Sequence, residues 1–330
     1  MAGLRGEVRA FLAEERAAGG YEPRCDAWLS GHSPEFSHRL AERGWVGMTW
    51  PQQYGGHERS YMERYAVLEE LLAAGAPVAA HWIADRQTGP LLLRYGTEAQ
   101  RQRFLPAVAR GECFFGIGMS EPDAGSDLAA VRTAARPVEG GYSVTGTKVW
   151  TSHAHRSDFM ITLVRTTPLG EDRHLGLSQL IVDLRGPGVT VRPIRLLSGE
   201  PHFNEVIFEE ALVPAEMLVG TEGEGWKQVT SELAYERSGP ERFLSTFPLL
   251  AETVTELGDD PGEAGARTLG ALYARLDGLR RLSMDVARRL QGGEVPNPGV
   301  PAKSLDFAGL NVQAALVKDL GTTFERQVIE

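Results

Sequence analysis

The chain has 330 residues, of which 42% are hydrophobic and 24% are charged, a composition typical of a globular protein with a large core. At this length we expect two or three domains. The formal net charge is −10, and no block of Lys or Arg supplies the electrostatic footprint of a nucleic-acid-binding protein. No apolar run reaches the length of a membrane span, and the first residues lack the apolar core of a signal peptide. We therefore expect no contact with nucleic acid or membrane, and a cytoplasmic location.

Residues 1–112 are predicted to form an all-α domain, because their apolar positions recur at helical spacing and so share one buried face of each helix. Pro51 and the pair Gly55-Gly56 end one helix and force a loop before the helical run that starts at Tyr61. The positions expected to be buried are Val8, Phe11, Leu12, Phe36, Leu40, Trp45, Tyr65, Leu68 and Leu72.

From residue 113 the apolar pattern changes to period two, and β-branched and aromatic residues become more frequent, as in β-strands. The run Glu139-Gly140-Gly141 is a tight-turn signal, which predicts a hairpin between residues 132–138 and 142–149. Short strands separated by turns rich in Gly and Pro favour a compact β-sandwich or barrel over residues 113–222. The further strands expected are 159–164, 179–183, 189–194 and 203–208.

Helical periodicity returns after the glycine-rich run 220–225 and predicts helices near 225–257, 263–291 and 307–328. The third domain, 223–330, is therefore expected to be all-α. The predicted fold class is α+β, with an all-α N-terminal domain, a central β-barrel or sandwich domain, and a C-terminal α-helical bundle.

Two segments of the β domain contain residues suited to a flat ring with one polar edge. The first, Phe114-Phe115-Gly116-Ile117-Gly118-Met119-Ser120-Glu121-Pro122-Asp123-Ala124-Gly125-Ser126-Asp127-Leu128, offers small residues and backbone donors. The second, Lys148-Val149-Trp150-Thr151-Ser152, offers a Trp to lie against the ring. With these motifs the sequence resembles the acyl-CoA dehydrogenase family, whose FAD lies on a segment reading Tyr-x-x-Thr-Glu-Pro-x-Ala-Gly-Ser-Asp and under a Trp-Ile-Thr triplet. A short Gly-x-Gly such as residues 116–118 is a weak signal by itself, but the longer pair of strings is specific.

The resemblance implies a role for each matching residue of the first segment. Met119 and Ser120 would bond the flavin ring through backbone and hydroxyl groups. Gly125 and Ser126 would line the approach of the ribityl chain and pyrophosphate, and Ser126 would also contact the substrate. The competing interpretation is an ordinary strand and turn.

Trp150 and Ser152 would, by the same resemblance, cover the outer face of the flavin, although a Trp in a strand is usually a core residue. His153 and His155 follow directly, where the family usually has Asn and Gly. We expect His153 and His155 either to lie at the edge of the flavin or the entrance of the substrate site, or to be partly exposed loop residues. The other histidines considered, at 38, 57, 81 and 202, show no pairing with acids or cysteines four residues away that would make a metal site, and Cys25 and Cys113 lack ligand spacing. We expect no metal.

Dehydrogenation of a thioester requires a base beside the α-carbon and a hydride acceptor beside the β-carbon, and a carboxylate in an apolar pocket can be the base. The isovaleryl and long-chain branch of the family places its catalytic Glu in a Leu-x-x-Glu-Arg setting, which Leu233 to Arg237 reproduces. The resemblance implies that Glu236 is the base and that Arg237 contacts the acyl-CoA. Pro240 has no N–H for the carbonyl of Glu236, so we expect the helix to bend there. A solvated helix acid with a salt-bridge partner is the simpler alternative.

The chain departs from the family pattern near its end. Family members continue past the helix matching residues 312–327 into a helix begun by Gln-x-x-Gly-Gly, which reaches across the dimer to the ADP half of FAD. We expect this segment to be absent from a C-terminally shortened member. An Arg-x-x-Phe-Gly element, which holds the pyrophosphate, is also not recognisable between Gly258 and Gly270.

The resemblance therefore implies an FAD-dependent oxidoreductase that converts an acyl-CoA or acyl-carrier thioester to its α,β-unsaturated form and passes electrons to an electron-transferring flavoprotein. An oxidase or a redox-neutral flavin reaction stays open. So do three assemblies: a homo-oligomer with rebuilt ADP contacts, a heteromer with a related subunit that supplies the missing elements, and a non-catalytic, flavin-free scaffold partner.

Overall fold

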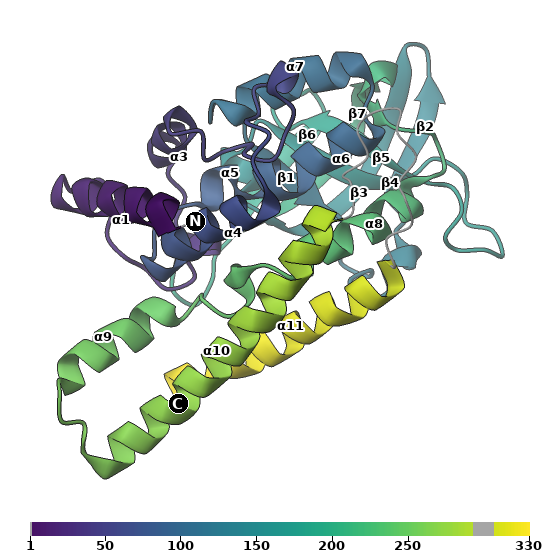
Figure 1. Ribbon diagram of the computed structural model, residues 1–330. Coiled ribbons are helices and arrows are strands. Elements are labelled where there is room, and N and C mark those ends of the chain that lie inside the picture. Colours follow the sequence, from purple (N-terminus) through teal and green to yellow (C-terminus); the bar gives the residue numbers. More distant parts are fainter. Residues whose placement is uncertain (1, 293–306) are drawn as a thin grey trace. The chain divides into compact units, whose positions relative to one another are not determined.

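The computed structural model describes residues 2–292 and 307–330, except for the side chains of residues 232–236, 292, 307 and 308. It forms two compact units (Figure 1), one from Met1–Gln52, Gly56–Ala79 and Leu233–Glu330, the other from Gln53–Gly55 and Ala80–Glu232. Along the chain, helices are followed by strands and then by helices again, which confirms the predicted α+β class. The domain limits 1–112, 113–222 and 223–330 stay a prediction.

The N-terminal helices of the first unit pack through the apolar faces that the sequence predicts. Val8, Phe11 and Leu12 are buried, and the Phe11 ring meets Trp45 edge-on with 5.3 Å between ring centroids. Ser60 begins the last of these helices with a capping box that also uses Glu63. These helices are α1 (Ala2–Ala17), α2 (Ala27–Ser30), α3 (Pro34–Glu42) and α4 (Tyr61–Ala73).

The predicted single helix at 225–257 is wrong. Helix α8 (Gly225–Arg237) ends before Gly239, which is extended at ψ 169°, and Pro240 starts a short 3-10 turn rather than a bend within a helix. The Pro ring disfavours helical backbone at the residue before it, so Gly239 leaves the helix. Helix α9 (Phe247–Leu257) then begins afresh.

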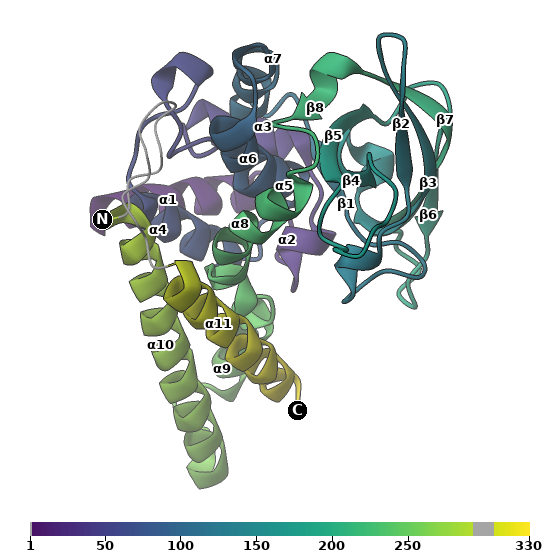
Figure 2. The same cartoon turned by 90° about the vertical axis from the view of Figure 1, so that its right-hand side faces the viewer.

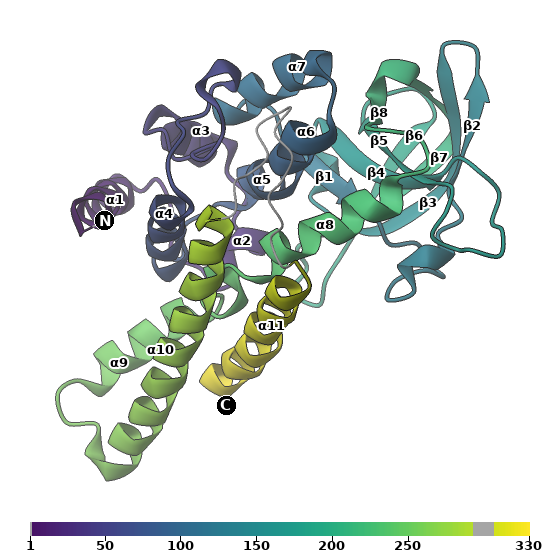
Figure 3. The ribbon, with the colours of Figure 1, turned by 45° about the vertical axis from the view of Figure 1, so that its right-hand side comes forward.

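Two long helices, α10 (Gly262–Gly292) and α11 (Phe307–Ile329), lie side by side in the first unit (Figure 3). Gly321 of α11 lies against the turn after α8, because a Cβ at this position would fall 2.1 Å from the Arg242 carbonyl oxygen. Among the described residues, none of the helices combines the length and apolarity needed to cross a bilayer.

Short helices precede the sheet in the second unit. Thr97 caps one of them in a capping box with Gln100, whose side-chain amide also donates to the carbonyl oxygens of Glu216 and Leu218 at 2.7 and 2.8 Å. This links the helix to the strand that begins at Leu218. The helical segments are α5 (Ala79–Ile83), a π-helical turn η2 (Ala84–Thr88), α6 (Gly89–Tyr95) and α7 (Glu98–Ala109).

The strands of the second unit form one eight-stranded sheet in the order β6-β7-β3-β2-β4-β5-β8, with β1 parallel to β4 (Figure 2). The predicted hairpin is confirmed, since β2 and β3 pair antiparallel with Val138 opposite Gly141. Gly140 in the turn has φ +80°, a conformation that favours glycine. The strands are β1 (Phe115–Gly118), β2 (Ala134–Val138), β3 (Gly141–Ser152), β4 (Phe159–Arg165), β5 (Leu177–Asp183), β6 (Val189–Ile194), β7 (Phe203–Pro214) and β8 (Leu218–Val219).

Candidate functional site

The second unit brings the two motif segments together. Strand β1 leads into Met119 and Ser120, while β3 carries Lys148 to Ser152. The Lys148 ammonium donates to the Met119 carbonyl oxygen at 3.0 Å, and the Val149 N–H donates to the Ser120 carbonyl oxygen at 2.9 Å. Met119 and Ser120 are therefore held directly beside the strand that carries Trp150.

A buried ion pair joins the same segments. Lys148 is fully buried and its Nζ lies 2.9 Å from Glu121 Oε1. The Glu121 carboxylate also accepts the backbone N–H groups of Arg132 and Thr133 at 2.7 and 2.8 Å, so its oxygens are well satisfied. Sequence analysis missed this pair, and the signal was a Lys at an inward-facing position of a strand.

Burial and pairing act in opposite directions on the pKa values of the two groups. Burial lowers the pKa of Lys148 to about 8, although the Glu121 carboxylate opposes that shift. Burial also acts to raise the pKa of Glu121, but the Lys148 charge and the hydrogen bonds from Thr133, Lys148 and Arg132 outweigh it, so that pKa lies below its ordinary value. The carboxylate form of Glu121 is therefore favoured in the folded protein.

The two glycines of this region have different reasons to lack a side chain. A Cβ on Gly118 would fall 2.7 Å from Met160 Cε and 3.3 Å from Lys148 Cγ, so the buried Met160 side chain would have to shift to admit one. A Cβ on Gly125 would meet nothing within 4 Å. Gly118 is therefore explained by packing inside the fold, whereas Gly125 and its neighbour Ser126 are exposed at the surface.

Trp150 has the most unusual backbone of the site. Its φ is +62°, and its side chain is 57% exposed, although its ring meets Phe203 edge-on with 6.0 Å between centroids. A bulky residue in this left-handed region costs on the order of 1–3 kcal/mol, and such strain clusters at functional sites. The prediction that Trp150 is available to a ligand therefore has a physical basis. The alternative, a Trp buried in the core, is wrong.

A β-bulge causes this conformation. Lys148 pairs with Val206 and Thr151 with Asn204, so two residues of β3 face one residue of β7. The same strand pair has a second irregularity between Val144 and Gly146, where one residue of β3 faces two residues of β7 and Glu210 has a φ of +52°. In both irregularities a residue other than glycine has a left-handed backbone, Trp150 in β3 and Glu210 in β7.

The residues after Trp150 are tied down by a buried amide. Asn204 is fully buried, and its Nδ2 donates to the Thr151 carbonyl oxygen at 2.9 Å. Its Oδ1 lies 2.9 Å from Nδ1 of His155, a ring whose pKa burial lowers. His153 is buried, so its prediction as a partly exposed loop residue is wrong, and its φ of +52° starts the 3-10 turn Ala154–Arg156.

The remaining predicted ligands differ in exposure. Met119 packs against a buried apolar cluster that includes Ala124 and Val131. Ser120 and Ser152 are partly exposed, so their hydroxyls are accessible to a bound molecule.

Glu236 and Arg237 lie at the end of α8, in the other compact unit. The side chain of Glu236 lies outside the described residues, and Arg237 is partly exposed. Their assignment as base and substrate contact rests on the sequence pattern and stays a prediction.

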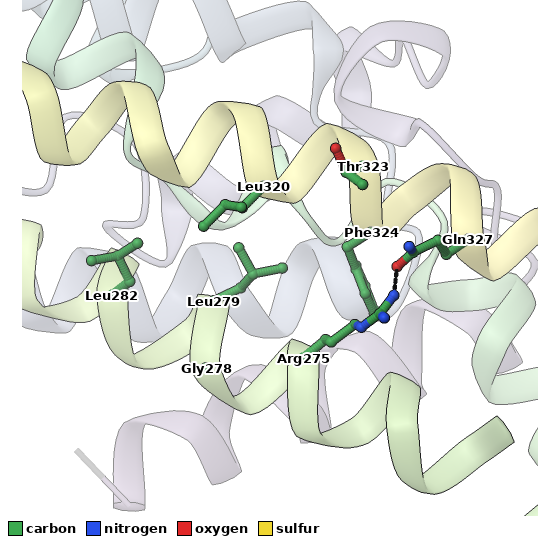
Figure 4. A pocket seen from close by; sticks show the side chains of 8 residues that line it. All are labelled: Arg275, Gly278, Leu279, Leu282, Leu320, Thr323, Phe324 and Gln327. Atoms are coloured by element: carbon green, nitrogen blue, oxygen red, sulfur yellow. Dashed lines mark hydrogen bonds between the residues drawn. The ribbon is translucent and has the colours of Figure 1, made fainter. Parts of the chain in front are cut away.

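A groove of about 420 Å³ lies between α10 and α11 in the first unit (Figure 4). Leu279, Leu320 and Phe324 form its apolar wall, and Arg275 is hydrogen-bonded to Gln327 at one end. No residue that the sequence analysis assigns to the flavin or the thioester lines this groove, so the motifs give it no role in the chemistry.

Within the described residues, no three His, Cys, Asp or Glu side chains gather as a metal site would require. His38 has Glu42 four residues further along the chain, with 3.8 Å between its Nε2 and Glu42 Oε1. A single exposed pair of this kind is still short of the four ligands of a structural zinc site.

Comparison with known proteins identifies the family of the N-terminal and middle parts of the chain. Residues 2–112 match the acyl-CoA dehydrogenase N-terminal domain, and residues 116–211 match the acyl-CoA dehydrogenase middle domain. Acyl-CoA dehydrogenase IpdE1 of Mycobacterium tuberculosis is 35% identical over 312 residues, which cover 90% of this chain and 79% of that protein.

Two solved structures have the same fold over nearly the whole chain. The Tcur3481-Tcur3483 steroid ACAD is 28% identical with a TM-score of 0.84, and the match covers 99% of this chain and 82% of that one. The ChsE4-ChsE5 complex from Mycobacterium tuberculosis is 29% identical with a TM-score of 0.78, covering 99% and 84% respectively. This chain belongs to the acyl-CoA dehydrogenase family, whose members are flavin-dependent oxidoreductases.

Proposed function

We propose that this chain binds FAD and oxidises an acyl thioester to its α,β-unsaturated form. The observation that carries the proposal is Trp150, an exposed aromatic side chain on strained backbone beside Met119 and Ser120. A flat ring with a polar edge fits this arrangement. The two motif segments together offer the planar face of Trp150, the partly exposed Ser120 and Ser152, and open space at Gly125. FAD, when bound, supplies the acceptor for the β-hydride.

The residues of the chain divide the remaining work. Met119 and Ser120 would orient the polar edge of the ring, and Trp150 with Ser152 would cover its outer face and exclude water. Gly125 and Ser126 would leave room for the ribityl chain and pyrophosphate.

In the proposed reaction, the carboxylate of Glu236 would take the α-proton of the thioester, and FAD, when bound, would supply the acceptor for the β-hydride, so that the double bond forms between the two carbons. Arg237 would hold the acyl-CoA beside Glu236. Loss of proton and hydride together avoids the accumulation of an unstable enolate. The proton is held by Glu236, and the two electrons pass to an electron-transferring flavoprotein, as the family implies.

Assembly with a related subunit is the form of the proposal favoured by the comparisons. The two similar structures are each named after a pair of proteins, Tcur3481 with Tcur3483 and ChsE4 with ChsE5. We propose that this chain works in the same way, as the subunit with the base, beside a related partner subunit. Because one of those structures is described as a steroid ACAD, steroid-linked acyl thioesters belong among the candidate substrates beside simple acyl-CoAs.

The test is to purify the chain alone and co-expressed with a related subunit, then to measure flavin absorbance and turnover of a panel of acyl thioesters. Glu236→Gln should retain FAD and lose on the order of 10³-fold in turnover, since it removes a general base. Glu232→Gln, one turn earlier in the same helix, is the matched control and should keep its activity. A protein that is colourless in both preparations would support the scaffold alternative.

A further inference from the structure

The backbone around Trp150 is held on both sides by hydrogen bonds from outside its own strand. On one side the Val149 N–H donates to the Ser120 carbonyl oxygen at 2.9 Å. On the other side the Thr151 carbonyl oxygen accepts from Asn204 Nδ2, also at 2.9 Å. Trp150 is the residue between these anchors, so the two bonds together hold it in its left-handed conformation.

We propose that Asn204 is a positioning residue for the flavin site, whose buried side-chain amide fixes the β-bulge that presents the Trp150 indole to the cofactor. This inference rests on the proposed FAD function. It assigns no contact with the flavin to Asn204 itself, because Asn204 is fully buried in β7 and acts through the main chain of its neighbour in β3.

The orientation of the Asn204 amide follows from its partners. A carbonyl oxygen can only accept, so the group that faces Thr151 has to be the NH₂ end. The Oδ1 end is then the acceptor for His155, whose Nδ1 has to donate across 2.9 Å. His155 therefore has its proton on Nδ1, and it holds the far end of the amide in place.

Gly146 of the same strand shows how a positive φ arises without such support. At Gly146 the strand can adopt a positive φ of +151° without a Cβ, and Thr133 leaves no room for one. At Trp150 the strand adopts a φ of +62° with a large side chain, and the two hydrogen bonds at Val149 and Thr151 stabilise that conformation. Thr151 and Asn204 lie opposite each other at the end of the bulge, where such a bond acts most directly.

The experiment compares Asn204→Leu, which removes the amide, with Asn204→Asp, which keeps the size and the acceptor for His155 but removes the NH₂ donor to Thr151. Gln179→Leu is the matched control. Gln179 is a fully buried amide of the same sheet whose polar atoms have no hydrogen-bond partner among the described residues, so its loss breaks no such tie.

The first measurement needs no flavin. The near-UV circular dichroism of Trp150 is obtained for each flavin-free protein as its difference from the same protein with Trp150→Phe. We expect this signal to change in Asn204→Leu and Asn204→Asp and to stay as in the wild type in Gln179→Leu. An unchanged Trp150 signal in folded Asn204→Leu or Asn204→Asp overturns the inference.

The second measurement is the Kd for FAD and the visible spectrum of the bound flavin, in the co-expressed complex where that is the form that binds. Asn204→Leu should raise the Kd about tenfold, which corresponds to about 1.4 kcal/mol, and should shift the flavin bands. The same substitution in a Trp150→Ala background should add no further loss, because its effect passes through Trp150. If Asn204→Leu weakens FAD binding as much in the Trp150→Ala background as in the wild type, the inference is contradicted. A wild type that binds no FAD contradicts the proposed function instead, and the first measurement then decides the inference.

Discussion

Lys148 and Glu121 form a buried ion pair that links the two motif segments, with Nζ 2.9 Å from Oε1. Glu121 belongs to the Glu-Pro-x-Ala-Gly-Ser-Asp string, and Lys148 begins the Lys-x-Trp-x-Ser string. Because the same ammonium also donates to the Met119 carbonyl oxygen at 3.0 Å, one side chain sets the distance between the two strings. The motifs therefore act as one structural unit, which explains why they occur together in this chain.

Replacing Lys148 by Met should destabilise the protein strongly. It leaves the Glu121 carboxylate buried without its counter-charge, and breaking a buried pair in this way costs about 3–5 kcal/mol. Chemical denaturation followed by far-UV circular dichroism measures the free energy of unfolding. Lys227→Met is the control. Lys227 is 66% exposed and its Nζ lies 3.7 Å from Glu224 Oε1 in a surface pair, so we expect the free energy of unfolding to change by no more than about 0.5 kcal/mol. A loss below about 1 kcal/mol for Lys148→Met would contradict the role given to the pair.

Acid should weaken the same pair. The pKa of Glu121 is lower in the folded protein than its ordinary value of 4.5, so the unfolded chain binds this proton first as the pH falls. Glu121 therefore contributes its full stability above the unfolded pKa and loses it as the pH falls through the folded pKa. The double variant Lys148→Met with Glu121→Gln lacks both titrating groups and is the reference. The stability difference between wild type and reference should shrink from pH 6 toward more acidic solutions, and a difference that stays constant or grows would show that Glu121 does not titrate as described.

Trp150→Gly should separate stability from function. Glycine adopts a positive φ without strain, so the flavin-free variant should be as stable as the wild type or about 1 kcal/mol more stable, even though it loses the contact with Phe203. The same change should weaken FAD binding, because the planar cover of the ring is gone. Thermal unfolding and FAD titration are the two measurements. For comparison, Trp50→Gly removes a side chain that is 2% exposed and should lower stability by at least about 3 kcal/mol.

Local signals in the sequence predicted much of this fold. The run Glu139-Gly140-Gly141 predicted the β2–β3 hairpin because a turn depends on neighbouring residues alone, and Gly140 adopts the positive φ that such a turn needs. The helical faces with Val8 and Phe11 were predicted for the same reason, since their periodicity is visible within one helix. The two motif segments could be matched to the family because the residues of each are close together in the chain.

The details of the site depend on contacts between distant residues, which a single sequence does not reveal. Asn204 donates to Thr151 from 53 positions away, and Lys148 reaches Glu121 across 27. Trp150 has no local reason to adopt a positive φ, because only the register of β3 against β7 creates the bulge. The break after α8 was readable in principle, but Pro240 was interpreted as a bend and the effect of its ring on Gly239 was not considered.

Gly321→Ala tests the packing of α11 against the turn that follows α8. In an exposed helix interior this change normally stabilises a protein by up to about 1 kcal/mol, because alanine is the better helix former. At Gly321 the new methyl group would lie 2.1 Å from the Arg242 carbonyl oxygen and 2.9 Å from the carbonyl carbon. Both are backbone atoms, which cannot rotate away from the methyl group as the end of a flexible side chain can. We therefore expect a loss of about 1–3 kcal/mol, as for other overpacked sites. Gly270→Ala in α10 is the matched control, since a Cβ there meets nothing within 4 Å, and it should be neutral or stabilising. Equal effects of the two substitutions in thermal unfolding would mean that α11 does not press on this turn, and the distance between Gly321 and Arg242 would then be larger in solution.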